Sequence, residues 1–519
     1  MAMSRESKLI VFVAVLASLL EIVDTSIVNV AIPTMMGNLG ATLEDISMVI
    51  TGYVIANAVV LPVSAWLGER IGRRKYYLGC IMAFTTFSVA CGLAPNLTTL
   101  IIFRIFQGLA GGALLPTSQT LIYEQFPKEK AGMAGAIFGM SVMIGPALGP
   151  VLGGYLTDNY GWRSIFNINL PMGILTVIIG SLVIFNRPGS EHTKKTAFDG
   201  IGLALLCIGI GALQFVLERG EADDWFDSNL IMILTALAVI CLPAFIIWEL
   251  RVKNPIINVR LFKDPIVTYG TALMGCLGFF LYGVIFILPT FIARVLGYDA
   301  TQTGELFIPG SILTAAMMPM IGRSMQAGVN SKILIGIGLV SLEICLLVMT
   351  GFSTATGKGD ILSALYIRGF AMAFLFVPIN SSILSQFTGE NLGQVSGLLN
   401  LFRQIGGSMG IALISTLLTS KSAQNYTDLI SHVSLLRPVV AAQFYQTMNG
   451  LQTKVGNMAG MGDSFHAAVM SMYYKVQAQV FMMSFLQLMW TMMAIFSISF
   501  IPLYLLKLKS KVVAITDSH

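Results

Sequence analysis

The chain has 519 residues, of which 55% are hydrophobic and only 11% are charged, whereas soluble domains carry about 25% charged residues. A water-soluble fold could not cover so much apolar surface, so the composition excludes an ordinary soluble enzyme, a secreted disulfide scaffold and a disordered chain. The six cysteines lie in or beside apolar stretches without CxxC spacing, which indicates neither disulfides nor a metal site. We expect an all-α polytopic membrane protein with no metal or cofactor.

Apolar stretches recur along the whole chain, each long enough to cross roughly 30 Å of hydrocarbon as a helix. We predict fourteen spans, at 9–32, 45–67, 77–94, 98–121, 133–156, 165–185, 200–217, 230–249, 267–291, 304–321, 332–351, 361–386, 396–419 and 478–506. The first span is too long for a signal-peptide core and contains two acids, so we expect it to be permanent.

An even number of spans places both termini on one side of the membrane. Most of the 31 Lys and Arg fall in segments that are inside when the N-terminus is cytoplasmic, and the positive-inside rule therefore predicts two cytoplasmic ends. Polar breaks at 186–199 and 250–264 predict three parts. These are an N-terminal six-helix bundle (1–190), a two-helix insert (191–262), and a C-terminal six-helix bundle (263–519) with an external loop at about 420–475. That loop is either a variable exposed segment or a docking surface.

The first span contains Glu21 and Asp24, which are three residues apart and share one helical face. Charged side chains in a span cost several kcal/mol and mark function by default. Burial and a nearby arginine act in opposite directions on carboxylate protonation. An acid whose surroundings alternate between the two can therefore load and release a proton. The alternative is a static ion pair that fixes the packing.

The fourth span has a polar and glycine-lined face on which Arg104, Gln107, Gly108 and Gly111 recur at helical spacing. A guanidinium stays protonated and can act as a fixed counter-charge to a neighbouring acid. The alternative is a packing arginine satisfied by carbonyl groups.

The second half of the chain also has charged residues in its spans, namely Glu343, Arg368 and Arg403. Glu343 and Arg368 could be partners, but the sequence does not establish the pair. We assign proton coupling to Asp24, Arg104, Glu21 and Glu343, and substrate binding to Asn29, Gln107, Arg403 and Gln404.

Two further segments predict conformational gating. The fifth span repeats glycine and proline in register, which predicts a smooth, bent helix that rocks on its neighbour; a plain packing face is the alternative. A short basic turn joins the second and third spans and could lock one conformation. The gating residues are Gly68, Glu69, Arg70, Gly72, Arg73, Gly145, Pro146, Gly149, Pro150, Gly153 and Gly154.

These residues resemble the major facilitator superfamily, and within it the fourteen-span drug:proton antiporters of the EmrB type. The resemblance covers about residues 9–506. The segments that carry it are 24–33, 68–75, 104–112, 145–154, 213–225, 248–262, 288–310 and 403–407. The chain departs from the family's loop motif at Glu69, where an Asp is usual, and at Ala65, where the leading Gly is usual.

The resemblance implies two six-helix bundles around a central cavity and export of apolar or cationic drugs by alternating access, with the proton gradient as energy source. It also implies a bacterial inner membrane, a periplasmic adaptor and an outer-membrane channel. Lipid is an expected partner and nucleic acid is not. The alternative in the same fold is a dedicated exporter of one siderophore, peptide or antibiotic. A membrane-embedded enzyme is a remote alternative, because we find no clustered nucleophile or metal set.

Overall fold

The computed structural model describes residues 3–184, 199–455 and 461–506, which form helices and connecting turns without a β-strand. Thirteen helical segments of these described ranges are long and apolar enough to cross a membrane. The 20-residue helix α3 (Arg73–Gly92) completes the predicted set of fourteen. The all-α, polytopic architecture is thereby confirmed.

The described residues of the first half form helices α1 to α8. Their bounds are α1 Arg5–Leu39, α2 Leu43–Ile71, α3 Arg73–Gly92, α4 Leu97–Gly111, α5 Leu114–Glu124, α6 Ala131–Tyr160, α7 Ser164–Asn167 and α8 Asn169–Val183. The side chain of Asn96 accepts a hydrogen bond from Thr99 N at 2.9 Å and so caps α4. Gly40 ends α1 with a φ of 61°, a conformation that glycine adopts without strain.

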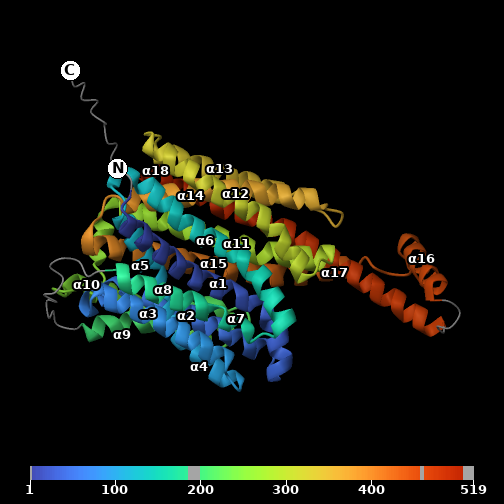
Figure 1. Cartoon of the computed structure of the whole chain (residues 1–519). Helices are drawn as coiled ribbons and strands as arrows, with labels where there is room; N and C mark the ends of the chain where they lie inside the picture. Colours follow the sequence, from blue (N-terminus) through green and yellow to red (C-terminus); the bar gives the residue numbers. More distant parts are fainter. Residues whose placement is uncertain (1–2, 185–198, 456–460, 507–519) are drawn as a thin grey trace.

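The remaining helices form the insert and the second half. Their bounds are α9 Gly200–Arg219, α10 Asn229–Arg251, α11 Pro265–Leu296, α12 Ala300–Gln326, α13 Ser331–Met349, α14 Lys358–Leu384, α15 Gly389–Ile430, α16 Pro438–Val455, α17 Met461–Phe496 and α18 Phe500–Leu505. The start of α1 and the end of α18 lie at the same end of the bundle (Figure 1).

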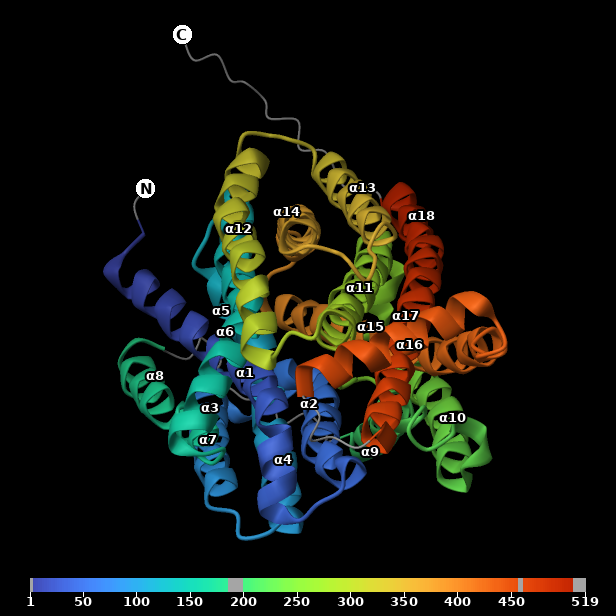
Figure 2. The ribbon, with the colours of Figure 1, turned by 90° about the vertical axis from the view of Figure 1, so that its right-hand side faces the viewer.

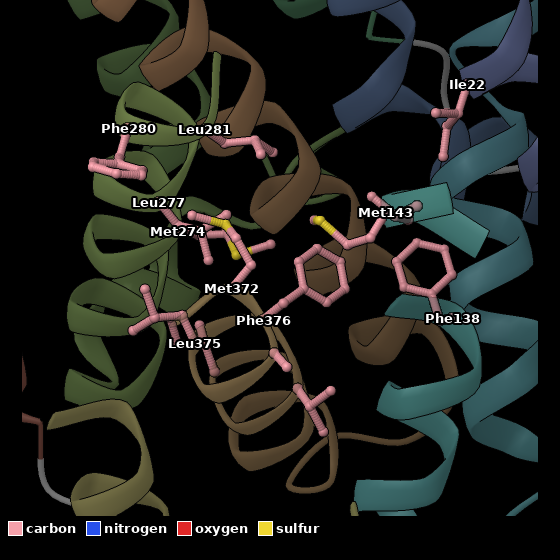
Figure 3. Packing of buried hydrophobic residues seen from close by; sticks show 14 of the residues in the cluster. Ile22, Phe138, Met143, Met274, Leu277, Phe280, Leu281, Met372, Leu375 and Phe376 are labelled. Atoms are coloured by element: carbon pink, nitrogen blue, oxygen red, sulfur yellow. The ribbon is translucent and has the colours of Figure 1, made fainter. Parts of the chain in front are cut away.

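The two halves meet along helix pairs from either side, chiefly α6 with α12 and α2 with α15 (Figure 2). The α6–α12 pair is antiparallel, because Gly132 lies against Gly322 at one end and Gly154 lies near Thr301 at the other. Between these pairs, α14 reaches α6, where the rings of Phe138 and Phe376 are 6.1 Å apart (Figure 3).

The insert packs against both halves at once. Helix α9 contacts α2 of the first half, α15 of the second half, and its own partner α10. An apolar cluster holds these elements together and includes Leu61, Ile210, Phe245 and Leu398. The insert is therefore a bridge across the boundary between the halves.

Most of the described part of the predicted external segment at about 420–475 is helical. α15 continues to Ile430, α16 covers Pro438–Val455, and α17 begins at Met461. Figure 1 shows α16 and the start of α17 standing out from the bundle. A helix that prolongs a membrane span is already nucleated, so the ends of α15 and α17 need no strong apolar face to remain helical.

Candidate functional site

The centre of the first half contains a buried carboxylate, Asp24, held by three donor side chains from two other helices, α4 and α8. Asp24 Oδ2 forms an ion pair with Arg104 Nη1 at 2.6 Å. Asp24 Oδ1 accepts hydrogen bonds from Gln107 Nε2 at 2.9 Å and Asn169 Nδ2 at 2.8 Å. All four side chains are buried. Every donor is aimed at an acceptor-only carboxylate, which is the geometry that suits the ionised form.

The guanidinium of Arg104 is fixed on its other sides as well. Its Nε donates to the carbonyl of Val49 at 3.3 Å, and its Nη1 donates to Gln107 Oε1 at 2.9 Å. The plane lies over the ring of Tyr53, with 4.1 Å from Cζ to the ring centroid. A buried ion pair is tolerable only when its remaining donors are satisfied in this way.

A second layer of hydrogen bonds orients Asn169. Its Nδ2 also donates to Ser88 Oγ at 2.9 Å, and Ser88 donates to the carbonyl of Phe166 at 2.8 Å. The cluster therefore joins α1, α3, α4 and α8. Sequence reasoning missed Asn169 and Ser88 because it searched the spans for charged residues; a search for amides inside spans would have found Asn169.

Glu21 occupies a separate buried site although it shares a helix face with Asp24. Its Oε1 accepts from Asn57 Nδ2 at 2.8 Å, and its Oε2 accepts from the backbone N of Leu115 at 3.0 Å. Leu115 lies in the first turn of α5, where backbone N–H groups lack partners within the helix. The carboxylate thus caps a helix that begins after the interruption at 112–113.

A polar network crosses from the first half to the second near this cap. Gln119 of α5 donates to Asn380 Oδ1 at 2.7 Å and accepts from Asn400 Nδ2 at 2.7 Å. Arg403 donates through Nη2 to Asn400 Oδ1 at 3.2 Å. The predicted residue Arg403 is therefore part of the boundary between the halves; Gln119, Asn380 and Asn400 were not predicted.

The other predicted site residues lie apart from both clusters. Glu343 is on the outer helix α13, where its Oε1 accepts from Ser497 Oγ at 3.0 Å. Arg368 lies over the ring of Phe307, and among the described residues it forms no ion pair with Glu343. Asn29 is exposed, and Gln404 is half-buried.

The glycine row of α6 lies against α1. A side chain at Gly145 would meet Ile22, one at Gly149 would meet Ser26, and one at Gly153 would meet Ile27. Ser26 Oγ donates to the carbonyl of Gly145 at 3.3 Å. Pro146 and Pro150 lie inside the same continuous helix. Gly154 differs from the row, since it faces Thr301 of α12.

The basic turn joins α2 to α3 through Gly72, whose φ of 93° favours glycine. Arg73 Nη1 forms an ion pair with Glu124 Oε2 at 2.6 Å, which ties the turn to the end of α5. Arg70 lies over the ring of Trp66 at 5.4 Å. Gly68 and Glu69 lie in the last helical turn of α2.

The comparisons with known proteins agree on one family. The model of the Major Facilitator Superfamily matches residues 14–411. Multidrug export protein EmrB of Escherichia coli K12 is 36% identical over 432 residues, 83% of this chain and 84% of the relative. Fatty acid resistance protein FarB of Neisseria gonorrhoeae is 36% identical over 420 residues, 81% of this chain and 82% of the relative.

Solved structures share the fold at low identity. The human organic anion transporter MFSD10 (TETRAN) superposes with a TM-score of 0.62 at 14% identity, covering 97% of this chain and 100% of that chain. The proton:xylose symporter XylE superposes with a TM-score of 0.57 at 15% identity, covering 83% of this chain and 91% of that chain.

Proposed function

The chain belongs to the Major Facilitator Superfamily, and from this membership we propose that it exports apolar and cationic drugs in exchange for protons. The identity to EmrB-type exporters over most of the chain supports multidrug export. No GxxxxGK[ST] stretch occurs in the sequence, so a proton gradient is a better candidate than ATP for the energy source.

The observation that carries the proposal is the buried Asp24 cluster. A carboxylate paired with a fixed cation inside the membrane changes protonation when the surrounding helices move, because its ionised form is stabilised only by those few donors. Asp24 receives donors from α4 and α8, so a shift of α1 against them alters the pair directly.

The transport cycle follows from that dependence. Drug enters from the cytoplasm or inner leaflet while Asp24 is ionised and paired with Arg104. A proton that arrives from outside neutralises Asp24, loosens the pair and weakens retention of the drug. The glycine row of α6 provides the surface on which α1 slides. Proton and drug drive the cycle because they favour different conformations.

The energy available is adequate for uphill export. One charge that moves inward through 100 mV gains about 2.3 kcal/mol, which corresponds to a concentration ratio of tens-fold per proton. We place the protein in a bacterial inner membrane with both termini cytoplasmic, and we assign residues 1–190, 191–262 and 263–519 to first bundle, insert and second bundle. A periplasmic adaptor and an outer-membrane channel complete the export route.

The test is Asp24→Asn in proteoliposomes with an imposed pH gradient. The amide keeps the size of the side chain but cannot exchange a proton, so gradient-driven efflux of ethidium should fall to the leak rate. Asp45→Asn, at an exposed carboxylate near the start of α2, is the control and should transport normally. Undiminished efflux by Asp24→Asn would remove Asp24 from the mechanism.

A further inference from the structure

Two buried side chains of opposite charge face the same polar region from different halves of the molecule. Glu21 on α1 is 3% exposed and Arg403 on α15 is 4% exposed. Among the described residues they form no ion pair with each other or with any other group. Each is therefore a buried ionisable side chain held by neutral partners.

Helix α5 connects the two side chains, because it contacts Glu21 directly and Arg403 through Asn400. Leu115 and Gln119 are four residues apart and share one face. Leu115 N contacts Glu21, and Gln119 contacts Asn400, which in turn accepts from Arg403. One turn of helix, a rise of about 6 Å, thus separates the two points of attachment.

Both charges have unused hydrogen-bonding capacity. Arg403 Nε is buried without a hydrogen-bond partner, and a buried unsatisfied donor is costly. The guanidinium fork matches a carboxylate in two parallel hydrogen bonds. Each oxygen of Glu21 accepts one hydrogen bond and has a second lone pair available for an ammonium group.

Apolar side chains adjoin this region. Asn380, which accepts from Gln119, lies with its Nδ2 3.9 Å from the sulfur of Met274. Figure 3 shows Met274, Met372 and Phe376 grouped beside one another where α11 and α14 meet. Flexible thioethers and rings adapt to apolar groups of different shape.

We propose that the protein binds amphipathic zwitterions between its halves. The ammonium group lies on Glu21, the carboxylate lies on Arg403, and the apolar body packs against the side chains of Met274, Met372 and Phe376. This inference rests on the proposed export function and specifies its substrate class. A ligand with both charges supplies the missing partners of Glu21 and Arg403 at once. It can do so only while it contacts both halves of the molecule.

The experiment compares three forms of one fluorescent probe in proteoliposomes: Nε-dansyl-lysine, its methyl ester and its Nα-acetyl derivative. These are a zwitterion, a cation and an anion. We expect wild-type protein to export the zwitterion fastest. Glu21→Gln should lower export of zwitterion and ester about tenfold and spare the acetyl form. Arg403→Gln should lower export of zwitterion and acetyl form about tenfold and spare the ester. Tenfold is the loss expected for one hydrogen bond to a charged group.

Matched controls are Glu305→Gln and Arg323→Gln, which remove exposed charges from α12 and should leave all three rates unchanged. Arg403→Lys retains the charge but not the fork, and should recover part of the loss. Yield and ethidium efflux of each variant report folding and the basic export cycle.

The outcomes separate the two proposals. If wild-type protein exports no probe and no ethidium under a gradient, the proposed function fails. If ethidium is exported but all three dansyl probes respond equally to Glu21→Gln and Arg403→Gln, the residues stabilise or gate the structure and the zwitterion site is overturned.

Discussion

The residues of the Asp24 cluster differ in the substitutions that they tolerate. Arg104 makes three kinds of contact at once: the ion pair to Asp24, the hydrogen bond from Nε to Val49 O, and the face over Tyr53. A lysine supplies one compact charge without the planar fork. Positive charge alone is therefore insufficient at this position.

We predict that Arg104→Lys folds but loses at least tenfold in gradient-driven efflux, whereas Arg104→Gln also loses stability. Leaving a buried carboxylate without its cation costs about 3–5 kcal/mol. The melting temperature of the purified protein and ethidium efflux check both statements. Arg323→Lys is the exposed control. A glutamine variant as stable as the wild type would contradict the prediction.

Asn169 supplies the hydrogen bond that approaches Asp24 from α8. Asn169→Leu should destabilise the protein by about 1–3 kcal/mol, because Asp24 and Ser88 both lose a buried donor. Thermal unfolding in detergent measures this loss. Asn38→Leu, at an exposed position of α1, should change the melting temperature little; equal losses would mean that burial is irrelevant here.

The sequence predicted the charged members of the site and Gln107, but not the other uncharged members. Asp24 and Arg104 were recognisable because a charge in a span is expensive. Asn169, Asn57 and Gln119 were not recognised, because only charged residues were sought in the spans and the partner of each amide lies in another helix. The separation of Glu21 from Asp24 was equally hidden, since it depends on the interruption between α4 and α5.

At the scale of helices, the α1–α6 contact depends on the absence of side chains. A methyl group at Gly149 would overlap Ser26, whereas Gly37 on α1 has open space around it. We predict that Gly149→Ala lowers both stability and efflux, because α1 must move away from α6, and that Gly37→Ala does neither. Efflux assays and melting curves of the two variants provide the comparison. Normal efflux by Gly149→Ala would show that this contact opens freely.

The insert is held to each half by different side chains. Arg219 donates to Glu44 O and Ser47 Oγ on α2, at 3.2 and 2.9 Å. On α15, Ser415 and Thr419 donate to Glu221 at 2.9 and 2.6 Å. Ser408 and Thr416 of α15 also bond the insert, through Glu218 at 2.8 Å and Trp225 at 3.0 Å. The bridge therefore has polar attachments on both sides.

Releasing either attachment should loosen the spacing of α2 and α15. We predict that Arg219→Ala and Glu221→Ala each broaden the distribution of distances between spin labels placed on these two helices. Pulsed electron paramagnetic resonance measures that distribution. Asp227→Ala, in the connecting segment beyond α9, is the reference. Unchanged distributions in both variants would show that the insert is held without these two side chains.

At the scale of the whole molecule, the membrane-spanning part of the fold was predictable from the sequence. The helices that extend beyond the membrane were not. Span number and approximate positions followed from hydropathy, since only helices satisfy their backbone within one segment in lipid. The structure beyond the membrane had no such constraint. Helix α17 has 36 residues, about 54 Å at 1.5 Å per residue, and so extends well past the roughly 30 Å of hydrocarbon.

The length of α17 has a mechanical consequence. A continuous helix moves as one stiff rod, and its inner portion is packed against α11, α13 and α15. If the second half tilts by about 10°, the far tip of a 54 Å rod sweeps sideways by roughly 9 Å. Any neighbour resting on α16 would then be pushed once per turnover, so the rod converts a small rotation within the lipid into a stroke outside it.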